Sequence, residues 1–325
     1  MNRLYVLLQT VYHALPIPLM VKKRIHGLLS NYRKNVNSMV RSPVDLHVPD
    51  RKELILSRIS PATQEGLEIG PLCWPLVTKA ESNGKIYYVD FSTAEKSREK
   101  YKDDPNVDVN NIVETDYLWG KQTLPELVDG KLFDYVVASH VIEHVPNMLG
   151  WLREVASVLK DNGILALAIP DKRYTFDYKR ELTTLGVLVE SYLMNKRRPG
   201  IKDIFDQVSL ATKVDSYEAW SGKLDPSKLI HHGTPYEALV QAKKYLLSDE
   251  YNDVHVNILT PSSFLDILER ASKIDLFDFT VADFYSTAKN SHEFLVSLQR
   301  LPRNLVKENA LQLQIDSFEK ARKLI

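Results

Sequence analysis

The sequence is short of several features that would place it in other classes of protein. Its only cysteine, Cys73, excludes an internal disulfide and a cysteine-rich zinc site, and suits a reducing compartment. Its 42 basic and 42 acidic residues balance, so no overall field attracts nucleic acid, and we expect no such partner. No run approaches the ~20 apolar residues that cross a bilayer. The N-terminus lacks the cleavage pattern of a secretory signal, which favours a cytoplasmic protein.

The first 60 residues are expected to form an N-terminal helical extension. Apolar residues between Leu4 and Leu15 recur at helical spacing, and the basic cluster Lys22, Lys23 and Arg24 follows them. This pattern predicts a helix packed on the body of the protein or on another subunit of a homo-oligomer. The alternative is a peripheral helix on an anionic membrane surface, at the inner face of the membrane.

From Gly66 onward, apolar strand patterns alternate with helical ones. We expect strands at 66–70, 85–92, 109–116, 133–139 and 162–170, with a helix at 148–163. Apolar strands separated by helices predict a doubly wound, mostly parallel, Rossmann-like α/β sheet. Strands at 275–286 and 292–300 are expected to close it as an antiparallel pair, giving seven strands. A terminal helix is expected at 305–325.

The strand and helix alternation is interrupted after the fifth strand, which predicts four regions. These are an N-terminal extension (1–60), a cofactor-binding half (61–171), a mostly helical insertion that caps the acceptor (172–255), and a C-terminal part with the terminal helix (256–325).

The stretch "SHVIEHVPN" has the H-x-x-E-H spacing of a zinc-binding helix in some peptidases, through His140, Glu143 and His144. An apolar strand runs directly into His140, and Pro146 disfavours a helical conformation just beyond. No third ligand follows at the spacing of that family. The sequence therefore predicts a strand-to-loop turn at a ligand pocket, and no metal site.

The residues that follow the predicted strands suit a nucleoside ligand, because ligands of such sheets bind at the carboxyl ends of the strands. Gly70 lets a ligand approach the backbone closely. Asp90 is placed to accept the ribose hydroxyl protons, and Asp116 to receive the amine of adenine. The G-x-G-x-x-G of a dinucleotide site is absent, which argues against NAD and for a ligand without phosphates.

These segments together resemble a class I S-adenosylmethionine-dependent methyltransferase. The resemblance rests on "LEIGP", "YVD", "ETD" and "SHVIEHV", and extends through "IPDKRYTFD" and "HVNILTPSSFLDIL" to methyltransferases associated with bacterial O-antigen and surface polysaccharide genes. It implies S-adenosyl-L-methionine as the cofactor, with His140 beside the sulfonium. The expected cofactor-binding residues are Glu68, Ile69, Gly70, Pro71, Asp90, Phe91, Asp116, Ser139 and His140, and the methionine carboxylate is expected at Lys172 or Arg173.

The resemblance implies O-methylation of a sugar hydroxyl on a glycan or glycolipid precursor. Such a hydroxyl needs a base, and the candidates are His140, His144, Glu143 and Asp171. Arg173, Tyr174 and Asp177 are expected to bind the acceptor, whereas the insertion's His231 and His232 are expected in a solvent-facing loop. The alternatives are a methyltransferase for a small metabolite and a non-catalytic cofactor-binding partner in polysaccharide assembly.

Overall fold

A seven-stranded mixed sheet lies at the centre of the described part of the chain. The computed structural model describes residues 49–248 and 250–325, so the predicted N-terminal helix lies outside the described residues. The strand order is β3-β2-β1-β4-β5-β7-β6. Strands β1 to β5 pair in parallel, whereas β7 is antiparallel to both β5 and β6. The strands are β1 Gly66–Ile69, β2 Ile86–Asp90, β3 Tyr117–Leu118, β4 Phe133–Ser139, β5 Leu159–Pro170, β6 Phe279–Tyr285 and β7 Glu293–Arg300. The predicted doubly wound sheet is therefore confirmed.

Both faces of the sheet are covered, which explains why its central strands are apolar throughout. In β4, Val136 and Ala138 face one apolar cluster, and Tyr135 and Val137 face another. Helices α5, α6, α7, α11 and α12 contribute to the first cluster, and α3 to the second. The helices are α3 Arg51–Ile55, α4 Ala94–Tyr101, α5 Leu124–Leu127, α6 Met148–Val158, α7 Leu185–Leu193, α8 Ile201–Leu210, α9 Ser216–Trp220, α10 Pro235–Leu246, α11 Pro261–Ser272 and α12 Lys307–Arg322.

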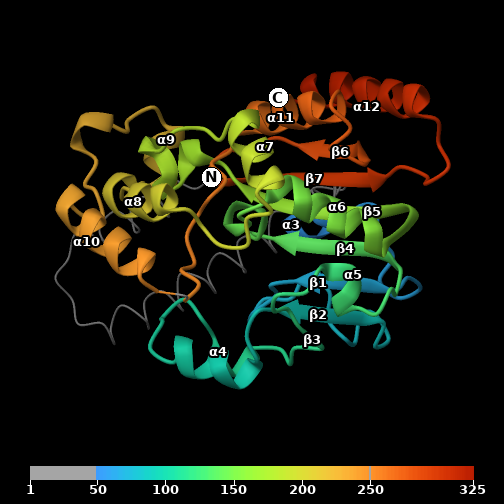
Figure 1. Cartoon of the computed structure of the whole chain (residues 1–325), viewed down its shortest axis with the longest axis horizontal. Coiled ribbons are helices and arrows are strands. Elements are labelled where there is room, and N and C mark those ends of the chain that lie inside the picture. The colour runs from blue at the N-terminus through green and yellow to red at the C-terminus, as the bar shows by residue number, and fades with distance from the viewer. Residues whose placement is uncertain (1–48, 249) are drawn as a thin grey trace, which may run out of the picture. The chain divides into compact units, whose positions relative to one another are not determined.

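The insertion between β5 and α11 contains α7, which packs on the helices that cover the sheet, and α8 to α10, which lie toward the carboxyl ends of the parallel strands. In Figure 1, β4 points toward the side on which α8, α9 and α10 gather, and β7 points away from it. The insertion thus lies on the side of the sheet where a ligand is expected. Within the described residues, no helix is long and apolar enough to cross a membrane.

The prediction of a third strand at 109–116 is wrong. Residues Val109–Asn111 form a 3-10 helix, whose first turn is capped by the side chain of Asp108. The strand is only two residues long and begins at Tyr117. Asp116 therefore precedes the strand and does not follow it.

The predicted end of the helix at 148–163 is also wrong. Helix α6 ends at Val158, and the buried Leu159 pairs with Phe133 of β4. Burial of Leu159 in the sheet outweighs the helix-end signal at Gly163, because a local signal is weaker than the burial of a large apolar side chain.

Gly66 provides a test of the packing between β1 and β4. It lies opposite Tyr135 in the register, and a Cβ at this position would approach the Tyr135 ring to 2.0 Å. We expect Gly66→Ala to lower the free energy of unfolding by roughly 1–3 kcal/mol through overpacking. The matched control is Gly186→Ala in α7, where the nearest atom is 3.9 Å away and alanine is favoured in a helix. Urea unfolding that gave both variants the same stability would contradict this account.

Candidate active site

The segment after β4 is a tight turn and not a continuous helix. His140 has a φ of +55°, and its N–H donates to the carbonyl of Ala168 in the adjacent strand at 2.9 Å. Ile142–His144 forms one 3-10 turn, and the side chain of Asn147 then caps α6. This turn presents the His140 imidazole at the carboxyl edge of the sheet.

The His140 imidazole is held between two carboxylates. Its Nε2 lies 2.8 Å from Oε2 of Glu293, and its Nδ1 lies 3.4 Å from Oε1 of Glu143. Burial acts to lower the pKa of His140, but these carboxylates prevail and raise it to about 9. An imidazole between two carboxylates keeps protons on both nitrogens, which does not suit a general base.

Glu293, at the start of β7, also binds Arg51 of α3. Arg51 donates from Nε to Oε1 at 2.5 Å and from Nη2 to Oε2 at 2.9 Å. Burial acts to raise the pKa of Glu293, yet the hydrogen bonds from His140 and Arg51 lower it to about 2. Arg51 Nη2 also donates to Oγ of Ser139 at 2.8 Å. The sequence did not indicate either Arg51 or Glu293, because both are remote in the chain from β4.

The residues at the end of β1 form a cradle for a ligand. Gly70 has a φ of +67°, and a Cβ there would approach Cγ2 of Val141 to 3.1 Å, so this position needs glycine. Ile69 and Pro71 bury their side chains and offer the edge only their backbone.

Glu68 supports this cradle from inside the protein. It is 2% exposed, and its carboxylate accepts the N–H groups of Leu76 at 2.7 Å and Val77 at 3.1 Å. Burial raises the pKa of the Glu68 carboxyl to about 7, against the opposing effect of these hydrogen bonds. Glu68 therefore positions the loop that follows Gly70.

Asp90 and Phe91 at the end of β2 fit a nucleoside. One oxygen of Asp90 accepts the N–H of Ser92 at 3.2 Å, and burial raises the pKa of this carboxyl. No ion pair with a cation engages Asp90 among the described residues. The adjacent Phe91 ring is 59% exposed, an apolar face beside a carboxylate. This pair matches the needs of a ribose and a base.

Asp116 lies away from that edge. Its Oδ2 accepts the N–H of Tyr88, in the middle of β2, at 2.7 Å, and Lys79 Nζ at 2.8 Å. This placement follows from the late start of β3 and favours a structural role for Asp116.

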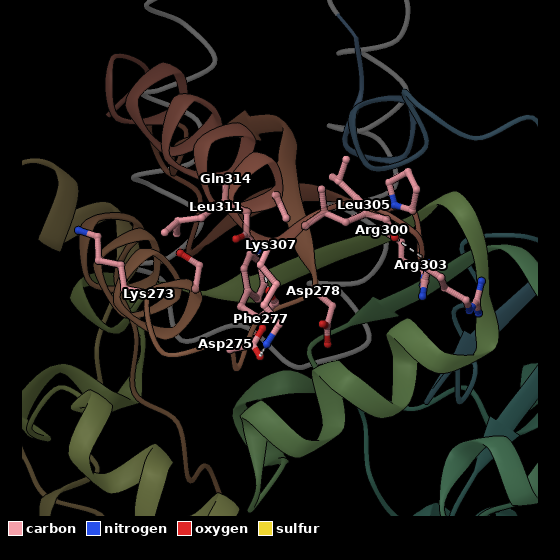
Figure 2. A pocket seen from close by; sticks show the side chains of 14 residues that line it. Lys273, Asp275, Phe277, Asp278, Arg300, Arg303, Leu305, Lys307, Leu311 and Gln314 are labelled. Atoms are coloured by element: carbon pink, nitrogen blue, oxygen red, sulfur yellow. Dashed lines mark hydrogen bonds and ion pairs between the residues drawn. The ribbon is translucent and has the colours of Figure 1, made fainter.

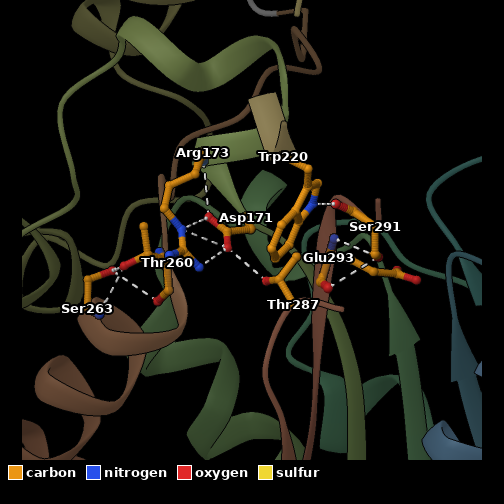
Figure 3. A network of polar contacts seen from close by, with 8 residues as sticks. All are labelled: Asp171, Arg173, Trp220, Thr260, Ser263, Thr287, Ser291 and Glu293. Carbon is orange, nitrogen blue, oxygen red and sulfur yellow. Dashed lines mark hydrogen bonds and ion pairs between the residues drawn. The ribbon is translucent and has the colours of Figure 1, made fainter. Parts of the chain in front are cut away.

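Asp171 and Arg173 are engaged with each other, as Figure 3 shows. Asp171 is fully buried, and Arg173 donates to both of its oxygens, at 2.6 Å from Nη2 to Oδ2. Thr287 Oγ1 adds a hydrogen bond to Oδ2 at 2.7 Å. Lys172 donates to the carbonyl of Arg180. These contacts suit anchoring of the insertion better than proton transfer or binding of the methionine carboxylate.

Asp177, expected to bind the acceptor, is buried as well. Its Oδ1 accepts from Arg180 Nη1 at 2.9 Å, and its Oδ2 lies 2.6 Å from Nδ1 of His255. Burial acts to raise the pKa of Asp177, but His255 and Arg180 lower it. Asp177 therefore orients His255.

A cavity of about 520 Å³ lies beside His140 and is lined by residues of β5, the insertion and the start of β7. The Tyr174 ring contributes to its wall and stacks on Trp220 of α9 at 4.3 Å between centroids. Trp220 Nε1 donates to the carbonyl of Ser291 at 2.8 Å, so α9 is fastened to the loop before β7 (Figure 3). His292 lines this cavity too, whereas the exposed His231 and His232 are not among its lining residues.

A second cavity, of about 410 Å³, is lined by residues of α11, α12 and the end of β7 (Figure 2). Its wall includes Arg300 at the end of β7, which is antiparallel to β5 and so ends at the amino side of the parallel strands. Arg300 pairs with Asp161 at 2.5 Å. This cavity is remote from the ligand edge of the sheet.

The strand order, the turn at Gly70, and the pair Asp90 and Phe91 at the carboxyl ends of the strands fit a Rossmann-like methyltransferase. Comparison with known families agrees: the model of the methyltransferase domain family matches residues 66–271. The chain belongs to this family.

Two curated relatives are ubiquinone biosynthesis O-methyltransferases. The protein from Rickettsia canadensis is 31% identical over 84 residues, which are 26% of this chain and 32% of the relative. The protein from Rickettsia felis is 30% identical over 84 residues, 26% of this chain and 31% of the relative. The chain thus matches about a third of the length of each relative.

The chain is also similar to solved methyltransferase structures. The CcbJ methyltransferase from Streptomyces caelestis is 14% identical, with 80% of this chain and 99% of that chain covered and a TM-score of 0.38. A putative S-adenosylmethionine-dependent methyltransferase from Listeria monocytogenes is 10% identical, with 77% and 97% covered and a TM-score of 0.38.

The raised pKa of Glu68 predicts a pH dependence of stability. The folded carboxyl titrates near pH 7 and the unfolded one near 4.5, so the folded state keeps its proton longer. The contribution of Glu68 to the free energy of unfolding is therefore greatest below pH 4.5. It falls as the pH rises through 7, by at most about 3 kcal/mol. Glu68→Gln should remove this fall, while losing one loop hydrogen bond. Parallel wild-type and mutant curves of unfolding free energy against pH would contradict the assignment.

Proposed function

We propose that the protein is an S-adenosylmethionine-dependent O-methyltransferase that acts on a sugar hydroxyl of a surface glycan or glycolipid precursor. One observation supports this above the others. His140 lines the cavity of about 520 Å³ and belongs to the same carboxyl edge of the sheet as Gly70 and Asp90. A donor at the edge and an acceptor in the cavity would meet there, and methyl transfer depends mainly on such positioning.

The cofactor would be held by the residues at the ends of β1, β2 and β4. Gly70 allows close approach, Asp90 would accept the ribose hydroxyls, and Phe91 would cover the base. Arg51, beside Ser139 at the same edge, is a further candidate for the methionine carboxylate, through the part of its guanidinium that Glu293 and Ser139 do not engage. When bound, the cofactor supplies an electrophilic methyl group.

The cavity of about 520 Å³, here called the acceptor cavity, favours a ligand rich in hydroxyls. Its wall combines the Tyr174 ring with hydrogen-bonding side chains such as Thr175, Lys213 and Ser216. An aromatic face surrounded by polar groups is a surface on which a sugar ring packs and forms hydrogen bonds. The names of the two curated relatives support transfer to oxygen.

We assign the general base to His292. It lines the acceptor cavity and lies 5.7 Å from His140 between ring centroids, so an acceptor hydroxyl at this junction is within its reach. Burial, with the nearby positive charges of His140 and Arg51, lowers the pKa of His292 against the opposing effect of Glu293. His292 is thus neutral at pH 7 and free to accept a proton, and His140 orients the acceptor.

Two alternatives concern the acceptor and the catalytic role. A small metabolite acceptor would replace the glycan, or the protein would bind its cofactor without turnover as a partner in polysaccharide assembly. The helix that the sequence predicts at the N-terminus would make either a peripheral membrane contact, which would bring the site to a lipid-linked acceptor, or a contact within a homo-oligomer.

The cofactor assignment is tested by binding of S-adenosylhomocysteine. Asp90→Ala should weaken binding by on the order of 1–3 kcal/mol, because ribose hydroxyls lose their acceptor. Asp116→Ala is the matched control, and its affinity should stay near that of the wild type because its carboxylate faces Lys79 and Tyr88. If calorimetry gave equal affinities for wild type and Asp90→Ala, Asp90 would not be part of the cofactor site. A loss of affinity confined to Asp116→Ala would place Asp116 there instead.

The acceptor and base are tested by methyl transfer to a panel of sugar nucleotides, lipid-linked glycans and phenols, with mass spectrometry to detect one added methyl group. We expect transfer to a glycan acceptor, and His292→Asn should lower kcat by ~10²–10⁴-fold while leaving S-adenosylhomocysteine affinity unchanged. Transfer to phenols alone would exclude the glycan, and a near-normal kcat in His292→Asn would exclude this base.

A further inference from the structure

We propose that Glu143, His144 and His255 form a binding site for one divalent transition-metal ion of the zinc class. The sequence predicts no metal here, since no third ligand follows His144 at a familiar spacing. The fold supplies that ligand from His255, more than a hundred residues further along the chain. The inference is separate from the proposed methyl transfer, whose base we assign to His292.

The three side chains already converge. One ligand atom from each lies within 4.8 Å of the others, and Nε2 of His144 is 3.9 Å from Oε1 of Glu143. Metal–ligand bonds of about 2.0–2.2 Å place tetrahedral ligand atoms roughly 3.3–3.5 Å apart. Side-chain movements of about 1 Å would therefore close the site around an ion.

Glu143 is the strongest sign that something is bound. It is 1% exposed, and neither carboxylate oxygen has a hydrogen-bond partner among the described residues. The imidazoles of His140 and His144 lie 3.4 and 3.9 Å from its Oε1. His140 compensates part of the charge of this buried carboxylate, which accepts no hydrogen bond, and a cation between Glu143 and the two histidine ligands would compensate the rest.

Each histidine has a carboxylate close to its other nitrogen. His255 Nδ1 lies 2.6 Å from Asp177 Oδ2, and His144 Nδ1 lies 2.8 Å from Asp253 Oδ1. Both contacts leave Nε2 available. A carboxylate behind a ligating histidine is the usual outer arrangement of a metal site, because it fixes the tautomer and the ring orientation.

The backbone around the ligands is fixed as well. The carbonyl of Glu143 accepts the N–H groups of Val256 at 2.6 Å and Asn257 at 3.0 Å. The side-chain amide of Asn257 donates to the carbonyls of Ile142 and Val145, both at 2.8 Å. The two ligand segments are thus joined before any ion binds, which lowers the entropic cost of assembling the site.

The donor set defines the class of ion. Two imidazoles and one carboxylate suit zinc, cobalt or ferrous iron, whereas calcium and magnesium prefer oxygen ligands only. Three protein ligands leave at least one position open. Since His255 also lines the acceptor cavity, the ion would lie next to the acceptor and hold the loop after β4 against the end of the insertion.

The test is titration of the tag-free, chelator-treated full chain with Co²⁺, which reports a zinc-type site through its visible absorption bands. We expect one Co²⁺ per chain, displaced by Zn²⁺, and a higher melting temperature with the ion. Glu143→Gln, which keeps the side-chain shape, should weaken binding at least 10-fold, and Asp253→Asn roughly 10–100-fold. His231→Gln, an exposed histidine of the insertion, is the matched control and should bind as the wild type does.

Binding of S-adenosylhomocysteine by each variant will show that it is folded and separates this proposal from the proposed function. Three results would overturn the metal site: no stoichiometric Co²⁺ uptake by the wild type, equal uptake by Glu143→Gln, or loss of uptake in His231→Gln. The cluster would then be a charge network of histidines and carboxylates without an ion.

Discussion

The join between the loop after β4 and the segment before α11 is the constraint on which the site depends. It consists of two N–H groups donated to the carbonyl of Glu143 and the Asn257 amide that spans Ile142 and Val145. Because the segment before α11 directly follows the insertion, the join ties the C-terminal end of residues 172–255 to the loop after β4. It brings His255 to His144, and it holds the insertion over the carboxyl edge, where the acceptor cavity forms.

Charge pairing divides the acidic residues near this edge into two groups. Glu293, Asp171 and Asp177 each accept from an arginine and serve to fix other side chains. Asp90 has no cation paired with it among the described residues, and Glu143 has no hydrogen bond there. Since carboxylates with few or no hydrogen bonds in partly or fully buried positions are costly, these two are where a ligand gains most by binding. One would serve the cofactor and the other an ion.

The differences between prediction and structure have local physical causes. The strand expected at 109–116 fails because Asp108 caps a 3-10 turn and the edge strand β3 is only two residues long. That error carried Asp116 into the predicted cofactor site, although its carboxylate faces Lys79 and Tyr88. His140 led the sequence candidates for the base, but two carboxylates hold its imidazole, so we propose His292, in the loop before β7, in its place.

By itself the sequence determined the parallel sheet and its antiparallel closing pair. It also determined the strand ends that place Gly70, Asp90 and His140 at one edge. These follow from apolar runs and turn residues, which act over a few neighbouring positions. Only the tertiary structure decided which side chains meet: Arg51 with Glu293, Asp177 with His255, and His255 with the neighbourhood of Glu143. Such pairs lie far apart in the chain, and protonation depends on the burial and partners that folding supplies, so no local pattern specifies them.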